Sequence, residues 1–209
     1  MNALFLSANN SMHFAWYDDN RVSVGSISSH WKKRPPYQFD LKPFKGKPLK
    51  IQDLLSISSN DSLHFAWYLE RIPKGDPDYL LWVCAGPSNH LGAKRDWYPS
   101  QLPRGAHPEN LLFITSNNDI HFAWFRKEEE LWVGRGTSDN LGNKDVHHCL
   151  LPPDVKIEHI LYLASNDKEH FAFLRNGAYL AGKSDRLGRV RKGGVYDLAE
   201  LKDTMKVGE

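Results

Sequence analysis

The sequence has few cysteines and little excess charge. Only Cys84 and Cys149 are cysteines among its 209 residues, and they occupy different places in the chain's repeats, which argues against a disulfide framework and favours a reducing compartment. The formal net charge at pH 7 is only +2, whereas nucleic-acid-binding domains commonly carry a basic excess or a basic face. We therefore expect a cytoplasmic protein with no nucleic-acid partner.

Long apolar segments are also missing. No apolar run approaches the roughly 18 residues of a membrane span, and the run that follows Met1 is too short for a signal peptide. The middle of the chain holds no helical apolar period for three turns, and only the tail after Tyr196 could form a short helix. What remains are short apolar runs bounded by Gly, Asn, Asp, Ser and Pro, which are typical of strands.

One block occurs four times in slightly different forms. It reads ANNSMHFAWY from Ala8, SNDSLHFAWY from Ser59, SNNDIHFAWF from Ser116 and SNDKEHFAFL from Ser165. An apolar run precedes each block, and each block is followed by a second apolar run, a turn of the form Ser-x-x-hydrophobic, and a short final segment. The first runs are Ala3–Ser7, Leu54–Ser58, Leu111–Thr115 and Ile160–Ala164, and the second are Val22–Gly25, Leu80–Ala85, Leu131–Gly134 and Ala178–Ala181.

Four strands per repeat, with repeats of about 50 residues, predict an all-β, four-bladed β-propeller of antiparallel blades. The alternatives are another repetitive all-β assembly or a propeller completed by a second chain. We expect a single domain over 1–209, with repeats at about 1–47, 48–106, 107–155 and 156–209. Each blade would be contiguous, so the ring would close through the C-terminal residues Leu201–Glu209 or the molecule would form a homo-oligomer.

The repeated histidines have two interpretations. His13, His64, His121 and His170 could hold a transition metal around the propeller axis, since imidazole is a common metal ligand. They stand at the start of the second strand, however, one layer out from the channel, where a side chain packs between blades and can bind the preceding turn. We favour this structural role, with no cofactor, and we expect the Phe and Trp of the blocks to form the core between blades.

A second repetition follows the Ser-x-x-hydrophobic turn. Counted from its hydrophobic residue, a cation stands at +3 and a ring at +6 in the first three repeats, and the fourth repeat departs from this register. Small polar residues come before the hydrophobic residue, including Ser184 in repeat four. The candidate ligand-binding residues are Arg34 and Tyr37; Ser88, Asn89, Lys94 and Trp97; Ser138, Asp139, Lys144 and His147; and Arg191 and Tyr196.

Because two turns of each up-and-down blade fall at the same end, the block turns and the Ser-x-x-hydrophobic turns share one rim. A ring, a cation and small polar groups together suit a sugar. The arrangement resembles the β-propeller lectins of bacteria and fungi, which place sugar sites between blades with Arg or Lys, small polar residues and Trp or Tyr. The resemblance implies a multivalent protein that binds a glycan or another small molecule.

Two other functions remain open. One is a metal-dependent enzyme that uses the block histidines, and the other is a protein-interaction platform. The sequence lacks Cys-x-x-Cys spacings, a Gly-x-Ser-x-Gly elbow, a phosphate loop and a dinucleotide fingerprint. The absence of these motifs favours a binding protein over an enzyme.

Overall fold

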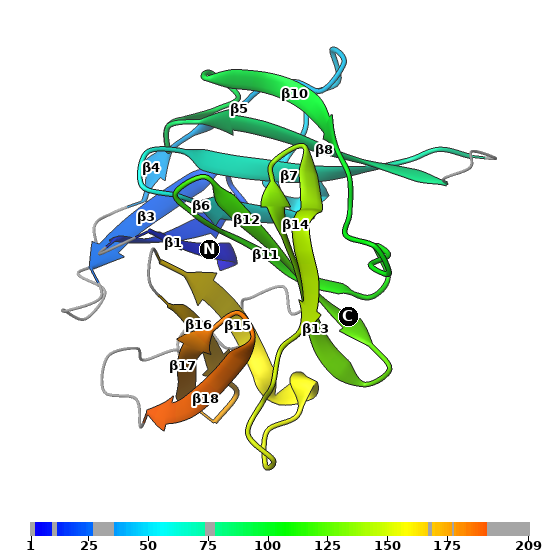
Figure 1. The fold of residues 1–209 in the computed structure, drawn as a ribbon. Coiled ribbons are helices and arrows are strands. Elements are labelled where there is room, and N and C mark those ends of the chain that lie inside the picture. Colours follow the sequence, from blue (N-terminus) through cyan, green and yellow to red (C-terminus); the bar gives the residue numbers. More distant parts are fainter. Residues whose placement is uncertain are drawn as a thin grey trace.

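A computed structural model describes residues 3–9, 12–26, 36–73, 78–166, 169–176 and 178–191. The chain is an all-β protein in which four antiparallel four-stranded sheets form the blades of a β-propeller (Figure 1). This confirms the fold predicted from the repeats. In the described part of the chain, no helix is long and apolar enough to cross a membrane.

Each blade is one contiguous stretch of chain, built from the inside outward. The strands are, in blade 1, β1 (Ala3–Asn9), β2 (Met12–Tyr17), β3 (Arg21–Ser26) and β4 (Tyr37–Gln38); in blade 2, β6 (Ser56–Ser59), β7 (His64–Arg71), β8 (Tyr79–Gly86) and β10 (Arg95–Ser100); in blade 3, β11 (Leu111–Asn117), β12 (Ile120–Lys127), β13 (Glu130–Thr137) and β14 (Asn140–His148); and in blade 4, β15 (Ile160–Ser165), β16 (His170–Leu174), β17 (Tyr179–Lys183) and β18 (Arg186–Arg191).

Short elements connect successive blades. The strand β5 (Asp40–Leu41) leaves blade 1 and pairs in parallel with β9 (His90–Leu91), which lies in the Ser-x-x-hydrophobic turn of blade 2. Single parallel bridges repeat this link between blades 2 and 3 (Gln101 with Asn140) and between blades 3 and 4 (Leu150 with Arg186). The 3₁₀ turns η1 (Ile51–Asp53) and η2 (Ile157–His159) precede blades 2 and 4. The hydrophobic residue of each described turn, Leu91, Leu141 or Leu187, is fully buried.

The four inner strands surround a nearly filled centre. Residues of β1, β6, β11 and β15 line a cavity of only about 10 Å³, which is about the minimum for one water molecule. The Phe and the following aromatic residue of each block lie in the layers between blades, as the sequence predicted, and Trp16, Trp67 and Trp124 are fully buried. The core is therefore a set of aromatic layers between blades.

The block histidines join these layers through a repeated chain of hydrogen bonds. Between blades 2 and 3, Trp67 Nε1 donates to Ser58 Oγ (2.9 Å), Ser116 Oγ donates to Ser58 Oγ (2.6 Å), and His121 Nδ1 lies 2.8 Å from Ser116 Oγ. The equivalent chains are Trp16–Ser7–Ser59–His64 between blades 1 and 2 and Trp124–Thr115–Ser165–His170 between blades 3 and 4. We call each one a polar relay.

The junction that closes the ring is different. Phe173 stands where the other blocks have Trp, and Ala164 and Ala8 replace the two hydroxyl residues, so these polar groups are absent together. Instead, Ala8 and Leu6 of β1 share an apolar cluster with Leu161 and Phe173 of blade 4. Blades 1 and 4 thus meet through apolar packing. The segment Leu201–Glu209, which the sequence suggested for closure, lies outside the described residues.

This contrast predicts how the relay responds to substitution. Ser116→Ala should lower the free energy of unfolding by about 1–3 kcal/mol, because Ser58 Oγ and His121 Nδ1 each lose a buried partner. The combination Ser58→Ala, Ser116→Ala and Trp67→Phe copies the closing junction, and it should cost less than the sum of its three single substitutions. Denaturant unfolding of the four variants measures both effects, and strict additivity would contradict the relay.

Candidate functional site

A ring on the outer strand of one blade contacts a serine in the turn of the next blade at three junctions. Tyr37 Oη donates to Ser88 Oγ at 2.6 Å, and Tyr98 Oη donates to Ser138 Oγ at 2.8 Å. At the junction of blades 3 and 4, His147 Nε2 lies 3.2 Å from Ser184 Oγ. The three rings occupy equivalent positions, because they pair with Val22, Val83 and Val133 of the third strands. The structure thus brings predicted rings and serines together in ring–serine pairs.

In blade 2 the ring of this pair is one residue later than the sequence count. The pairing of β10 with β8 shifts between Arg95 and Tyr98, so one extra residue is accommodated there and Tyr98, rather than Trp97, faces Val83. Trp97 instead donates its indole N–H to the carbonyl of Lys42 (2.9 Å) and packs edge-on against Phe44. Trp97 therefore packs between blade 2 and the segment that connects blade 1 to blade 2.

The other predicted residues are scattered around these pairs. Lys94 and Lys144 are exposed, and the cations found beside the rings are Arg95 and Arg135 instead. Asn89 and Asp139 accept hydrogen bonds at their backbone carbonyls from Asp40 and Gln101, which helps to link the blades. Arg191 occupies the position in blade 4 that is equivalent to those of the rings, because its backbone pairs with Tyr179 of the third strand. The side chain of Arg191 lies outside the described residues, as do Arg34 and Tyr196.

At the junction of blades 2 and 3 the ring face is already covered. The guanidinium of Arg95 lies 3.5 Å from the centre of the Tyr98 ring, which is a close cation–π contact. Burial raises the pKa of Tyr98 above its usual 10, so its phenol remains a hydrogen-bond donor to Ser138. A hydrogen bond from Thr137 lowers the pKa of Asp139, and the charge of Arg95 adds to this shift. This ring–serine pair is a link between blades whose Tyr98 face is shared with Arg95.

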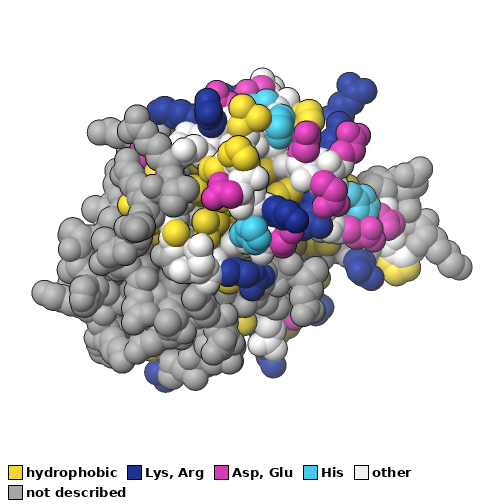
Figure 2. Space-filling model, turned by 90° about the horizontal axis from the view of Figure 1, so that it is seen from below, with side chains coloured by type: hydrophobic (Ala, Val, Ile, Leu, Met, Phe, Trp, Pro, Cys, Tyr) yellow, Lys and Arg dark blue, Asp and Glu magenta, His cyan; other side chains and the backbone are white. Residues whose placement is uncertain are grey.

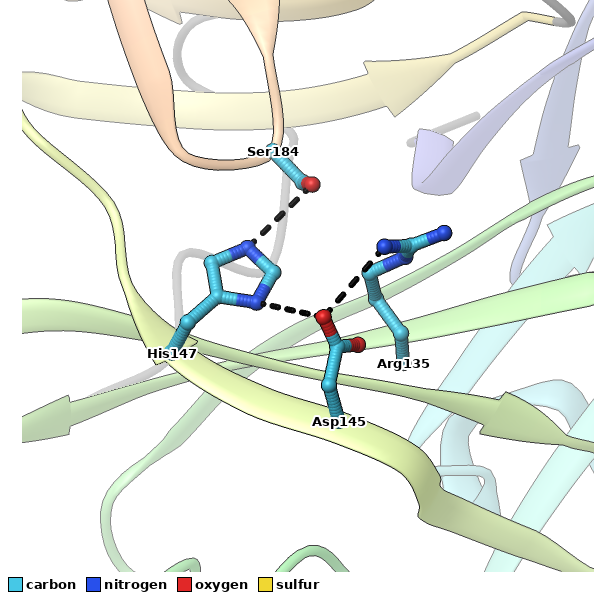
Figure 3. Close-up of polar contacts among 4 residues, drawn as sticks. All are labelled: Arg135, Asp145, His147 and Ser184. Carbon is cyan, nitrogen blue, oxygen red and sulfur yellow. Dashed lines mark hydrogen bonds and ion pairs between the residues drawn. The ribbon is translucent and has the colours of Figure 1, made fainter.

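At the junction of blades 3 and 4 the same position opens into a cleft of about 570 Å³. In Figure 3, His147 lies between two partners: Nδ1 is 3.1 Å from Asp145 Oδ2, and Nε2 faces Ser184. Arg135 Nη1 donates to the same carboxylate oxygen at 3.3 Å. The side chains of Arg135, Asp145 and His147 are 38%, 41% and 24% exposed, so the network is open to solvent.

The walls of this cleft come from both blades and from both turns of the shared rim. Lys183 and Asp185 flank Ser184 in the turn between β17 and β18, while Asn117, from the block turn of blade 3, forms another part of the lining. Phe122 and His170 also border the cleft, although both are almost fully buried. Charges of both signs also intermingle on the described part of the face in Figure 2.

The serine turn between β17 and β18 requires a glycine two residues before the serine. A Cβ atom on Gly182 would lie 2.0 Å from the carbonyl oxygen of Arg186, so only glycine permits this close approach. Gly86 and Gly136, two residues before Ser88 and Ser138, have the same constraint. The spacing Gly-x-Ser in three repeats was a usable signal for the turn. Arg135 and Asp145, by contrast, depend on which residues of β13 and β14 face each other, and the sequence count missed both.

The block histidines pack between neighbouring blades rather than around the propeller axis. Nδ1 of His64, His121 and His170 contacts a serine hydroxyl, and each ring also packs edge-on against the Phe and Trp of the preceding blade. Burial lowers the pKa of His13, His64 and His121 to about 4 and that of His170 to about 3. Among the residues that the structure describes, no three His, Cys, Asp or Glu side chains are grouped as metal ligands.

Comparison with known proteins finds similarity only among solved structures. No protein-family model and no curated protein matches the chain. Saccharomyces cerevisiae Prp20p is 12% identical, over 86% of this chain and 43% of Prp20p, with a TM-score of 0.37. U3-55K is 10% identical, over 95% of this chain and 68% of that one, with a TM-score of 0.40, and the computationally designed Ika4 protein is 10% identical, over 87% and 90%, with a TM-score of 0.33. This chain therefore spans less than half of Prp20p.

Proposed function

We propose that this propeller binds carbohydrate on its shared rim, and that its main site is the cleft between blades 3 and 4. The observation that carries the proposal is the composition of that cleft. Asp145 as a carboxylate can only accept hydrogen bonds, and the guanidinium of Arg135 can only donate them. A sugar hydroxyl does both, so neighbouring hydroxyl groups can bridge this pair.

The pair also has unused bonding capacity. Within the described part of the protein, Arg135 Nε and Asp145 Oδ1 are buried and make no hydrogen bond. Buried polar atoms without partners are uncommon and costly in folded proteins. A small rotation of either side chain, both of which are more than a third exposed, would turn these atoms toward a ligand in the cleft. The ring–serine pairs Tyr37–Ser88 and Tyr98–Ser138 would serve as weaker sites on the same rim.

The proposal predicts the effect of removing the cation. After a panel of oligosaccharides has identified a bound glycan, titration calorimetry should show that Arg135→Ala weakens the strongest site at least tenfold, a loss of about 1.4 kcal/mol. Arg95→Ala, the matched change at the junction of blades 2 and 3, should leave the affinity of that strongest site unchanged. Melting temperatures of both variants show whether the fold persists. The proposal fails if no glycan binds, or if Arg95→Ala has the larger effect on that site.

A further inference from the structure

The cleft between blades 3 and 4 contains a serine, an imidazole and a carboxylate in the order required for acyl transfer. We propose that Ser184, His147 and Asp145 form a catalytic triad that hydrolyses esters. Ser184 Oγ lies 3.2 Å from His147 Nε2, and His147 Nδ1 lies 3.1 Å from Asp145 Oδ2. This inference uses the cleft of the proposed glycan site, but it does not require the ligand to be a glycan.

The direction of these hydrogen bonds follows from the donor inventory. An ionised Asp145 can only accept, so the proton of a neutral His147 imidazole lies on Nδ1 and Nε2 is left as an acceptor. Ser184 then donates its hydroxyl proton to Nε2, which is the arrangement of a general base poised beside a nucleophile. Asp145 acts through His147, so it is a positioning residue.

The equivalent junction shows what is special here. Tyr98 donates its phenol proton to Ser138, and a neutral phenol is too weak a base to take the proton of that serine. The strand register also places Arg95 where blade 3 has Asp145, because Arg95 pairs with Ala85 and Asp145 pairs with the equivalent Arg135. Blade 3 therefore has His147 where blade 2 has Tyr98 and Asp145 where blade 2 has Arg95, and these two changes convert a ring–serine pair into a triad.

The reaction uses only groups in the cleft and water. Ser184 Oγ attacks the ester carbonyl carbon as His147 Nε2 takes its proton, and the positive charges of Arg135 and Lys183, which line the same cleft, favour the oxyanion. The tetrahedral intermediate collapses with cleavage of the ester C–O bond, and the alcohol leaves with the proton from Nε2. Water then adds to the acyl-serine, assisted by His147, which releases the acid and restores Ser184.

Active-site labelling tests the triad without knowledge of the natural substrate. We expect a fluorophosphonate probe to modify one serine, identified by mass spectrometry as Ser184, and we expect the protein to hydrolyse p-nitrophenyl acetate and butyrate. Ser184→Ala should abolish labelling and lower kcat at least a hundredfold. Asp145→Asn should lower kcat with little change in KM, because the imidazole tautomer is no longer held. Ser62→Ala, an exposed rim serine outside the proposed sites, should behave as wild type.

The informative variant is His147→Tyr, which restores the ring of blades 1 and 2. It should keep the link to Ser184 and the melting temperature but lose labelling and hydrolysis, so a folding defect cannot mimic the result. Labelling at a site other than Ser184, no labelling of the wild type, or unchanged hydrolysis in His147→Tyr would each overturn the triad. Glycan binding by a protein that neither labels nor hydrolyses would leave the proposed function standing alone.

Discussion

The propeller is expected to lose most of its stability as the pH falls from about 6.5 to about 4. The four block histidines have their pKa lowered to about 4 or, for His170, about 3, because burial disfavours the charged imidazole. In this pH range the unfolded chain binds protons that the folded chain does not. The free energy of unfolding is therefore highest above about pH 6.5, and it decreases as the pH falls below that value.

The size of the effect follows from the shift. Between about pH 6.5 and pH 4, protonation linked to each histidine lowers the free energy of unfolding by up to about 3 kcal/mol. The four histidines together approach the whole stability of a typical domain. Denaturant unfolding at a series of pH values measures the loss. His121→Ala should be less stable than wild type near neutral pH but should lose less stability on acidification, whereas His90→Gln, a change at an exposed rim imidazole, should follow the wild-type curve. Equal wild-type stability at about pH 7.5 and pH 4.5 would refute this account.

Replacing one of the buried block tryptophans should have the largest effect of any single substitution. Trp67 is completely buried between blades 2 and 3, and its indole N–H is bonded to Ser58. Trp67→Ala should lower the free energy of unfolding by about 3–5 kcal/mol, because it leaves a large cavity and a relay without its donor. Urea unfolding monitored by circular dichroism gives this value directly.

The natural variation among repeats supplies the control. Blade 4 has Phe173 at this position, so Trp67→Phe tests the loss of the N–H and of a small volume while an aromatic ring is kept. It should cost less than half as much as Trp67→Ala. If the two substitutions are equally destabilising, the relay rather than aromatic packing dominates the layer; if both are harmless, the layer is not the core of the fold.

The fold could be predicted because the same strand pattern occurs in four repeats. The block histidines and their aromatic neighbours recur about every 50 residues, so each repeat checks the others. The replacement of Trp and two hydroxyl residues by Phe173, Ala164 and Ala8 is equally visible in the sequence, but its meaning depends on which blades touch. Closure of the ring by apolar packing between blades 1 and 4 therefore needed the structure.

The site was harder to predict, because its parts are defined by register. Counting from Leu91 selects Trp97, yet a single extra residue in β10 places Tyr98 beside Ser138. Arg135 of β13 and Asp145 of β14 lie opposite each other but are ten residues apart in the sequence, so no local motif identifies them. His147 and the serines were found because they recur, whereas the features that distinguish the cleft do not.

We propose the cleft between blades 3 and 4 as the functional site of the propeller. The most direct test of this proposal is nuclear magnetic resonance of the histidine side chains during addition of the glycan found on the panel, with the His147 signal assigned by its absence in His147→Tyr. We predict that the ring signals of His147 move and saturate with the glycan, while those of His64 and His121, enclosed between other blades, remain in place. If the His147 signals stay unchanged while the glycan binds, the ligand lies elsewhere and the claim is contradicted.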